Sequence, residues 1–415
     1  MSVMRNGLFL FLMTSAWLHA CGTHTAIMGT QKPSHSATSS LQVSEELIIG
    51  YTDDRQRADF CSRFKLAVVR VIPAIKVVVV NTPAGVSVRG LLRQTPGIRF
   101  VEKNHTVTIS PQVTSLPPIG LISNQNDDKR QEQWALDRID IERAWEVTEG
   151  SPNMIVAVVD TGIDYRHPDL QGKVLRGRDF INNDDDALDD NFHGTHCAGI
   201  LAARRQNGGI VGVSPGVTLL AVKVLSDRGA GTFAQVAAGI AYAAERGASI
   251  ISLSLGSSIP SQAMDEAIRY ARRKGSIVFA GAGNQGSEKP FYPAVNPDVI
   301  AVGATTREDR RARYSNMGSH LTVTAPGSDI LSTILNGGYA RVSGTSMATP
   351  HVAGVAALMK SINPRLDAEA VRRILTESAL DLGAGGFDTE YGHGRLQASK
   401  AVRTVKPQQA VIKTI

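Results

Sequence analysis

Hydrophobic residues in the C-terminal part of the chain fall into short continuous runs, separated by stretches in which apolar positions recur at helical spacing. A strand that is apolar throughout is buried on both faces, which is typical of a parallel sheet covered by helices on both sides. The runs are Ile155–Val159, Leu219–Val224, Ile250–Leu255, Ile277–Ala280 and Val299–Val302, and helices are predicted at Phe233–Glu245, Ser261–Lys274 and Val352–Lys360. The pattern therefore predicts an α/β domain over residues 127–405, with a doubly wound, mostly parallel sheet flanked by helices.

Residues 45–105 predict a second, smaller domain of the α+β type. Their apolar runs are rich in β-branched residues and are bounded by turn-forming residues, as expected of strands. Strands are predicted at 47–51, 77–80 and 98–102, and a short helix at 58–64. The next segment, 106–126, combines prolines with scattered serines and asparagines, so it is predicted to be a linker between the two domains.

Residues 1–20 predict a signal peptide. One positive charge precedes an apolar run over 8–18 that is too short to span a bilayer as a helix. The run ends just before Cys21, in a pattern that resembles a bacterial lipoprotein signal, where cleavage precedes a cysteine that is then lipidated. An ordinary signal with a chance cysteine is the alternative. Residues 21–44 are rich in Ser, Thr, Gly and His and predict a flexible tether, so we expect a secreted or cell-envelope protein whose precursor is lipid-anchored.

Composition narrows the class of protein further. Hydrophobic residues make up 42% of the 415 residues and charged residues 20%, which excludes a mostly disordered chain and a polytopic membrane protein. The net charge of +6 is a mild basic excess without a dense Lys/Arg cluster among aromatics, so no nucleic-acid partner is expected. Apart from Cys21, the cysteines are Cys61 and Cys197, which fall in different predicted domains and are therefore expected to be free thiols.

Three polar residues stand where parallel sheets place their chemistry, at strand ends and helix starts. Asp160 follows the run 155–159, His193 opens an alanine-rich helix, and Ser346 lies in a Gly-Thr-Ser-Met-Ala motif before another helix. A nucleophilic serine needs a base within hydrogen-bond reach and an acid that orients that base. A helix N-terminus also favours a developing oxyanion. These residues therefore predict an Asp-His-Ser triad.

Other hydrolase classes fit single motifs less well. Asp160-Thr161-Gly162 alone also fits an aspartic protease, but that mechanism needs a second such triplet or a dimer of short chains, and the sequence has no second Asp-Thr-Gly or Asp-Ser-Gly. The motif around Ser346 is close to the nucleophile elbow of α/β-hydrolases, in which the acid and the histidine follow the serine. Only His351 and His393 follow Ser346, and neither stands in a motif.

Two further patterns have competing interpretations. His193 and His196 could bind a metal, but no glutamate lies between them as it does in zinc proteases, and His196 also fits a core histidine. Residues 281–286 form a literal G-x-G-x-x-G after a predicted strand, but two prolines follow where a dinucleotide site needs a helix. Asn284 within this loop is better placed to donate its side-chain N–H to a substrate oxygen.

Together, Asp160, His193, Asn284 and Ser346 occur in the order and motif context of the subtilisin-like serine proteases, the subtilase family. The resemblance extends over residues 133–402. It includes the motifs His167-Pro168-Asp169-Leu170, Ser254-Leu255-Gly256 and Tyr391-Gly392-His393-Gly394-Arg395-Leu396. It implies that Ser346 attacks the scissile carbonyl and that His193 is the general base oriented by Asp160. Asn284 and the Ser346 backbone N–H would stabilise the oxyanion.

The two neighbours of His193 differ in how well they fit the family. Cys197 is similar to the cysteine of the thermitase and proteinase K branches. Phe192 departs from the family pattern, in which a small residue commonly precedes the catalytic histidine. We therefore expect Phe192 to narrow the cleft beside His193.

The resemblance also implies how a substrate and an inhibitor bind. Two segments would pair as edge strands with an extended substrate, which suits broad endopeptidase activity. They are Ser254, Leu255 and Gly256, and Gly229, Ala230 and Gly231. Residues 45–105 resemble the inhibitory propeptide of the family, an intramolecular inhibitor that is removed by cleavage within 106–126. An independent small domain is the alternative for 45–105.

Two sets of oxygen ligands resemble structural calcium sites of the family. The first set, Asp179, Asn182, Asp184 and Asp186, is spaced like a thermitase-type calcium loop. The second set is Asp127, Asp169 and Asn207, in which the loop around Asn207 is one residue short. A solvated acidic loop is the alternative. For the whole protein, the alternative to a self-activated protease is a catalytically inactive surface-binding protein on the same fold, which the intact catalytic positions disfavour.

Overall fold

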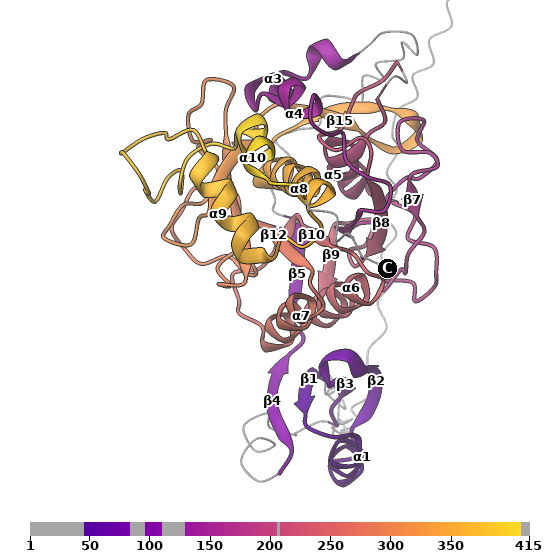
Figure 1. Ribbon diagram of the computed structural model, residues 1–415. Helices are drawn as coiled ribbons and strands as arrows, with labels where there is room; N and C mark the ends of the chain where they lie inside the picture. The colour runs from indigo at the N-terminus through magenta and orange to yellow at the C-terminus, as the bar shows by residue number, and fades with distance from the viewer. Residues whose placement is uncertain (1–44, 84–95, 110–128, 206–207, 408–415) are drawn as a thin grey trace, which may run out of the picture. The chain divides into compact units, whose positions relative to one another are not determined.

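The computed structural model describes residues 45–83, 96–109, 129–205 and 208–407 (Figure 1). The predicted signal peptide, tether and Cys21 lie outside the described residues, as do most of the predicted linker and the ligand candidates Asp127 and Asn207. None of the helices in these four ranges is long and apolar enough to cross a bilayer.

A seven-stranded parallel sheet forms the centre of the C-terminal domain, as the continuous apolar runs predict. Its strands are β6 (Ile155–Asp160), β7 (Val174–Leu175), β8 (Thr218–Lys223), β10 (Ile250–Leu253), β12 (Ile277–Gly281), β13 (Val299–Thr305) and β14 (Val323–Pro326). They are ordered β14-β13-β12-β10-β6-β8-β7, and every pair is parallel. The order reverses around β6, which is the topology of a doubly wound sheet, so the predicted fold class is confirmed.

Helices cover both faces of this sheet because successive strand residues point to opposite sides. In β6, Val156 and Val158 join one core cluster, whereas Ala157 and Val159 join the other. The first cluster contains residues of α3 (Trp134–Arg138), α4 (Ile141–Trp145), α5 (His193–Ala202), α8 (Thr345–Ile362), α9 (Ala368–Ser378) and α10 (Ala398–Thr404). The second contains residues of α6 (Phe233–Glu245) and α7 (Gln262–Arg273), so the sheet lies between two helical layers (Figure 1).

The helix α8 begins seven residues earlier than the sequence pattern predicts, at Thr345 instead of Val352. The prediction stopped short because Pro350 lies inside the helix and has no N–H to donate to the Ser346 carbonyl. In the structure this carbonyl instead accepts the Ser254 hydroxyl at 2.9 Å and the Cys197 thiol at 3.4 Å. The proline therefore opens a polar contact to other segments without ending the helix.

The N-terminal domain contains the predicted strands and helix, with additional elements. They are β1 (Glu46–Tyr51), α1 (Asp54–Arg63), β2 (Ala67–Ile72), the short 3-10 turn Pro73–Ile75, β3 (Val77–Asn81) and β4 (Ile98–Lys103). The strands form an antiparallel sheet in the order β2-β3-β1-β4. On one face of this sheet, Leu47 and Ile49 pack against Phe60 of α1. The other face packs through Ile48 and Val79 into the cluster that contains α6 and α7.

The first four residues of the predicted linker form a strand instead, which corrects the predicted boundary. Strand β5 (Thr106–Ile109) lies between β9 (Ala230–Thr232) and β11 (Leu255–Gly256) and is antiparallel to both. Val107 in its middle is completely buried. Because all partners of β5 lie far away in the sequence, only tertiary pairing makes this segment a strand.

The remaining elements lie outside the sheets described so far. A two-stranded antiparallel hairpin is formed by β15 (Ile330–Thr333) and β16 (Tyr339–Val342), joined through the 3-10 turn Leu335–Gly337. A further 3-10 turn covers Lys129–Glu132. Residues of α5 hydrogen-bond to this hairpin, since the Thr195 and His196 carbonyls accept the Thr333 and Ser332 hydroxyls.

Candidate active site

An aspartate and a histidine from neighbouring elements meet in the interior. Asp160 ends β6 and His193 begins α5, and the distance between Asp160 Oδ1 and His193 Nδ1 is 2.7 Å. The Asp160 side chain is 1% exposed and the His193 side chain 4%. Burial alone would disfavour the imidazolium, but the Asp160 carboxylate and its hydrogen bond, with a contribution from Asp189, raise the pKa of His193 above its usual value. The histidine is therefore poised to accept a proton.

A buried carboxylate holds the turn that leads into His193. Asp189 accepts hydrogen bonds from the backbone N–H groups of Asn191 and Phe192 and from both the N–H and the hydroxyl of Thr195. Phe192 takes a φ of 122°, a conformation that is rare for a bulky residue. Its ring packs against the core cluster of α5 and α8. The turn is thus fixed from both sides immediately before the histidine.

Ser346 is the second residue of α8, close to the helix N-terminus. Its hydroxyl donates to the Ser254 carbonyl at 3.2 Å. Asn284, which follows β12, accepts from the Thr345 N–H and from the Thr345 hydroxyl with its Oδ1, each at 2.9 Å. These two bonds fix the side-chain oxygen. If residue 344 had a Cβ atom, that atom would lie 3.2 Å from Asn284 Nδ2. Glycine at this position therefore avoids a tight contact with the Asn284 amide.

Cys197 is a further neighbour of Asp160 and His193, although the sequence motifs assign it no part in the site. Ligand atoms of Asp160, His193 and Cys197 lie within 4.8 Å of one another, the one such grouping of three His, Cys, Asp or Glu residues among the described ranges. Burial raises the pKa of the Cys197 thiol well above its usual value, so the sulfur is held as an uncharged thiol. The sequence signal that could have predicted this position is the spacing between His193 and Cys197, because residues four apart lie on the same face of a helix.

The cysteine prediction is confirmed, and the two additional histidines are core residues. Cys61 and Cys197 are both free and buried. His196 lies with its Nε2 3.1 Å from the Ala340 carbonyl, and burial lowers its pKa to about 3. His351 lies with its Nδ1 2.8 Å from the Met347 carbonyl, and burial lowers its pKa to about 4.

The two predicted substrate edges flank the strand β5. Ile109 donates its N–H to the Gly229 carbonyl at 2.9 Å and lies opposite Leu255. A Cβ at Gly229 would lie 2.6 Å from the Ile109 side chain. Strand β5 therefore occupies the groove between Gly229, Ala230 and Gly231 on one side and Leu255 and Gly256 on the other.

The segment before β5 also contacts the ends of two helices. Glu102 accepts the N–H groups of Gln262 and Ala263 at 2.8 and 3.0 Å at the start of α7. It also accepts the hydroxyl of Ser261, the N-cap of that helix. Asn104 Oδ1 accepts the Ala234 N–H in the first turn of α6 at 3.0 Å. Free N–H groups at helix N-termini attract such oxygens, so these contacts anchor the N-terminal domain.

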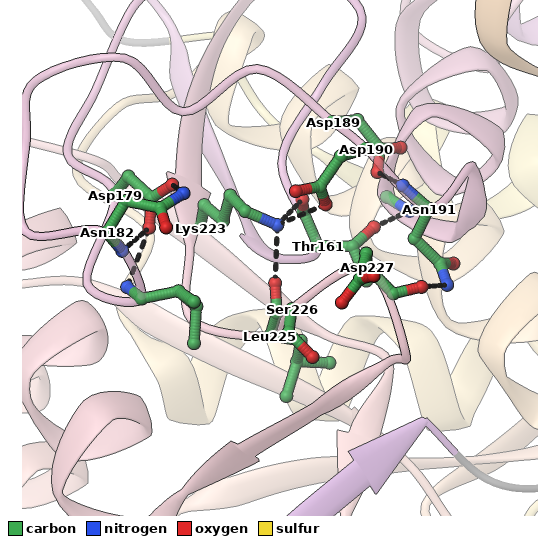
Figure 2. Close-up of polar contacts among 12 residues, drawn as sticks. Thr161, Asp179, Asn182, Asp189, Asp190, Asn191, Lys223, Leu225, Ser226 and Asp227 are labelled. Carbon is green, nitrogen blue, oxygen red and sulfur yellow. Dashed lines mark hydrogen bonds and ion pairs between the residues drawn. The ribbon is translucent and has the colours of Figure 1, made fainter.

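The first predicted ligand set forms one tight turn. The backbones of Asp179 and Asp184 exchange two hydrogen bonds, and the Asp179 carboxylate accepts the Asn182 side-chain amide at 2.9 Å (Figure 2). The Asp186 carboxylate accepts the Tyr165 hydroxyl at 2.6 Å. The three carboxylates are not drawn together to within 4.8 Å in the described structure. Of the second set, Asp169 is buried and accepts the Ile210 N–H and the Tyr339 hydroxyl.

Comparison with known proteins gives two family matches. Residues 151–394 match the model of the subtilase family, peptidase S8, and residues 30–104 match that of the fervidolysin N-terminal prodomain. The chain is 48% identical over 260 residues to the thermophilic serine proteinase of Bacillus sp. (strain AK1), which covers 62% of this chain and 64% of that protein. It is 46% identical over 272 residues to thermitase of Thermoactinomyces vulgaris, covering 65% of this chain and 96% of thermitase.

The fold has a solved counterpart. Fervidolysin from Fervidobacterium pennivorans, a keratinolytic enzyme related to subtilisin, matches with a TM-score of 0.77 and 31% identity. The match covers 90% of this chain and 63% of the fervidolysin chain, so this chain spans less than two thirds of that protein. The similarity thus extends over both domains of the described structure.

The buried histidines predict a loss of stability in acid. Above pH 6.5 the His351 imidazole is neutral in both the folded and the unfolded chain. Between pH 6.5 and about 4 only the unfolded chain binds the proton, because the folded pKa is about 4, so the free energy of unfolding should fall with the pH. A pKa difference of this size corresponds to a loss of about 3 kcal/mol in the free energy of unfolding once the pH has fallen to the folded pKa.

The measurement is denaturant unfolding of the full chain from pH 8 to 4, with Ser346→Ala to remove a reactive hydroxyl. His351→Gln should flatten the pH dependence in this interval. An equally steep loss of stability in the glutamine variant would contradict the assignment to His351.

Proposed function

Because this chain belongs to the subtilase family of serine endopeptidases, we propose that Ser346 is its nucleophile, with His193 as the general base and Asp160 as its orienting acid. The observation that carries the proposal is the buried 2.7 Å hydrogen bond between Asp160 and His193. Cys197, which lies within 4.8 Å of both, donates its thiol to the Ser346 carbonyl in the first turn of α8. Asn284 would stabilise the oxyanion together with the Ser346 backbone N–H. The intact set speaks against the inactive surface-binding alternative.

In the proposed mechanism the Ser346 hydroxyl attacks the scissile carbonyl while His193 takes its proton and later passes it to the leaving amine. The hydroxyl rests on the Ser254 carbonyl in the structure, so it has to turn toward His193 before it can react. Asp160 keeps the Nδ1 proton in place, which leaves Nε2 of His193 free to act as the base. Catalytic hydrogen bonds often tighten only when the substrate is bound.

The pairing of β5 supports the substrate class. An extended peptide would replace β5 between the two edge segments and form the same backbone hydrogen bonds to Gly229 and Gly256. Because backbone pairing makes few demands on side chains, this arrangement suits broad cleavage of proteins and peptides. The substrate-binding residues of this proposal are Ser254, Leu255, Gly256, Gly229, Ala230 and Gly231.

The same pairing supports a zymogen that is inhibited by its own N-terminal domain. Strand β5 ends at Ile109, opposite Leu255. The residue that precedes Leu255 is Ser254, whose carbonyl accepts the Ser346 hydroxyl. Strand β5 therefore ends beside the segment that holds the nucleophile's hydroxyl, and residues 110–126 follow it in the chain. We propose that the enzyme activates itself by cutting this chain within residues 110–126, a range rich in the exposed residue types at which chains are cut.

Removing the nucleophile tests both parts of this proposal. Ser346→Ala should abolish proteolysis and leave the uncut precursor, because the cut is intramolecular. Ser361→Ala, a serine of the same helix that donates only to the Ala357 carbonyl, is the matched control and should mature normally. N-terminal sequencing of the mature wild type locates the cut. Normal maturation of Ser346→Ala in a protease-free host would refute self-processing.

Asn284→Ala tests the oxyanion assignment separately. Loss of one oxyanion donor should lower kcat by about 10²–10³ with little change in KM. The measurement is steady-state hydrolysis of a peptide substrate by the mature variant, normalised to titrated active sites. An unchanged kcat would remove Asn284 from the proposed mechanism.

We further propose that Ca²⁺ binds the loop of Asp179, Asn182, Asp184 and Asp186, whose oxygen donors are of the type that calcium prefers. The residues fit in kind, and the tight turn between Asp179 and Asp184 brings their chain positions together. Asn182 would have to turn its amide, because its nitrogen faces Asp179 in the structure. Asp127, Asp169 and Asn207 are proposed as a second site, of which only Asp169 is described.

Chelation should destabilise the enzyme if calcium is bound in this loop. EDTA should lower the thermal midpoint of the chain and Ca²⁺ should restore it, because a bound cation offsets the repulsion between the negative charges of the loop. Asp184→Asn should reduce this response. Asp185→Asn is the control, because its side chain is 85% exposed and pairs with Arg178. No response to EDTA, with no calcium found by metal analysis, would leave a solvated acidic loop.

Export and anchoring complete the proposal. Extracellular processing fits the signal-like residues 1–20, and a lipid on Cys21 would lie on the prodomain side of the cut. We therefore expect precursor and prodomain in the membrane fraction and active enzyme in the soluble fraction. The measurement is fractionation of the wild type beside Cys21→Ser. Equal membrane partition of both precursors would refute lipidation, and mature enzyme that stays on the membrane would refute release.

A further inference from the structure

A lysine ammonium lies buried beside the proposed triad. Lys223 is the last residue of β8 and is paired across the ladder with Asp160 of β6, and its side chain is 1% exposed. Its Nζ donates to the Thr161 carbonyl at 2.8 Å, to Asp190 Oδ1 at 2.6 Å and to the Leu225 carbonyl at 2.7 Å (Figure 2). An ammonium has three N–H donors, and all three are used.

The three acceptors belong to three segments that each carry part of the site. Thr161 directly follows Asp160 at the end of β6. Asp190 lies in the turn that leads into His193. Leu225 lies in the loop that leads from β8 to β9, and β9 is one of the two edges that pair with β5. One side chain therefore joins the acid, the base and the substrate-pairing edge.

A second contact ties the same two loops together. Asn191, next to Asp190, donates its Nδ2 to the Asp227 carbonyl at 2.6 Å and accepts the His193 N–H with its Oδ1 at 3.2 Å (Figure 2). Asp227 lies in the loop that leads to β9. A shift of this loop would thus be passed to the backbone of His193.

The chemistry of the lysine suits this role. An ammonium is compact and can aim its donors at acceptors on different sides, whereas a guanidinium is planar. The two contacts to carbonyl groups are buried, so solvent does not compete for them, whereas the Asp190 side chain is 48% exposed. If the ammonium is removed, the Thr161 and Leu225 carbonyls lose a partner, and buried acceptors without partners drive local rearrangement. All three N–H donors of Lys223 are bound to these oxygens. Lys223 therefore influences Asp160 and His193 only through the residues next to them in the chain.

We propose that Lys223 is a positioning residue of the active site, which holds the Asp160 strand end, the His193 turn and the substrate-pairing loop in one mutual geometry. The inference rests on the proposed triad. It adds a residue that lies outside the catalytic motifs.

The test compares variants of the full chain after maturation, with active sites counted by a covalent serine titrant. Lys223→Met replaces the ammonium by an uncharged side chain of similar length. We expect kcat per titrated site to fall roughly tenfold to a hundredfold, because small misplacements of reacting groups lower the rate by such factors. Asp190→Ala removes one acceptor and should give a smaller loss, and Asp190→Asn, which keeps an oxygen, should give a smaller loss than Asp190→Ala.

Lys173 provides the matched control at the other end of α5. Its ammonium donates to the Ala202 carbonyl, at the last residue of the helix, at 2.5 Å and to the Pro215 carbonyl. Lys173→Met should lower the thermal midpoint as Lys223→Met does, because both leave carbonyls without a donor. It should leave kcat per titrated site unchanged.

The outcomes separate positioning from stability. A Lys223→Met enzyme with a lowered midpoint and an unchanged kcat per site, like Lys173→Met, would overturn the proposal. If Lys223→Met does not fold, the Asp190 pair decides, and equal kcat values in Asp190→Ala, Asp190→Asn and wild type would overturn it. A wild-type chain without titratable sites would instead refute the triad beneath the inference, whereas Ser346→Ala should lack titratable sites in any case.

Discussion

The Asp160 side chain is 1% exposed, so the charge of its carboxylate has to be compensated by groups inside the protein. An ionised carboxylate is far too costly to bury alone. Its Oδ1 accepts the Thr161 N–H and the ring of His193, both at 2.7 Å. Because β6 is paired with β8 and β10 on its two sides, the strand end that carries Asp160 is fixed in the sheet. The partners must therefore be held in place, which is the part played by the Asp189 turn and by Lys223.

The N-terminal domain is docked through contacts that the catalytic domain can lose without leaving helix ends uncapped. Ser261 caps α7 through Met264 and Thr232 caps α6 in a capping box with Gln235, independently of the N-terminal domain. Glu102 and the segment after it add acceptors to N-termini that already have a cap. Water can replace these added acceptors after cleavage. Such docking is compatible with an inhibitor that binds in the precursor and is later released.

The sequence predicts an element of this structure when the residues that determine it lie within the element itself. The strands from 155 to 302 are continuous apolar runs, and burial on both faces is a property that such runs show directly. Strand β5 has no comparable signal, because its partners β9 and β11 lie more than a hundred residues away, and the prolines that follow suggest a linker. The start of α8 was hidden by Pro350, which is tolerated because the Ser346 carbonyl has other donors.

The candidate site shows the same division. Asp160, His193, Asn284 and Ser346 stand in short motifs, and these motifs are readable because each joins a strand end or a helix start to one reactive group. Lys223 stands at the end of an apolar run and carries no motif. Its role depends on the carbonyl of Thr161 and the carboxylate of Asp190, which lie 62 and 33 residues away in the sequence, so no local spacing predicts it.

The two helix N-termini at the site place opposite demands on the charges that the proposed reaction creates. Helix α8 favours an anion at its start, so the oxyanion on the Ser346 side is stabilised there, together with the Asn284 donor. Helix α5 disfavours a cation at its start, yet His193 becomes positive there when it takes the proton. Asp160 outweighs this helix effect and burial, since the pKa of His193 is raised in the folded protein. Proton transfer from Ser346 to His193 therefore creates a positive charge next to the Asp160 carboxylate and a negative charge next to the N-terminus of α8. Both new charges are stabilised by their neighbours.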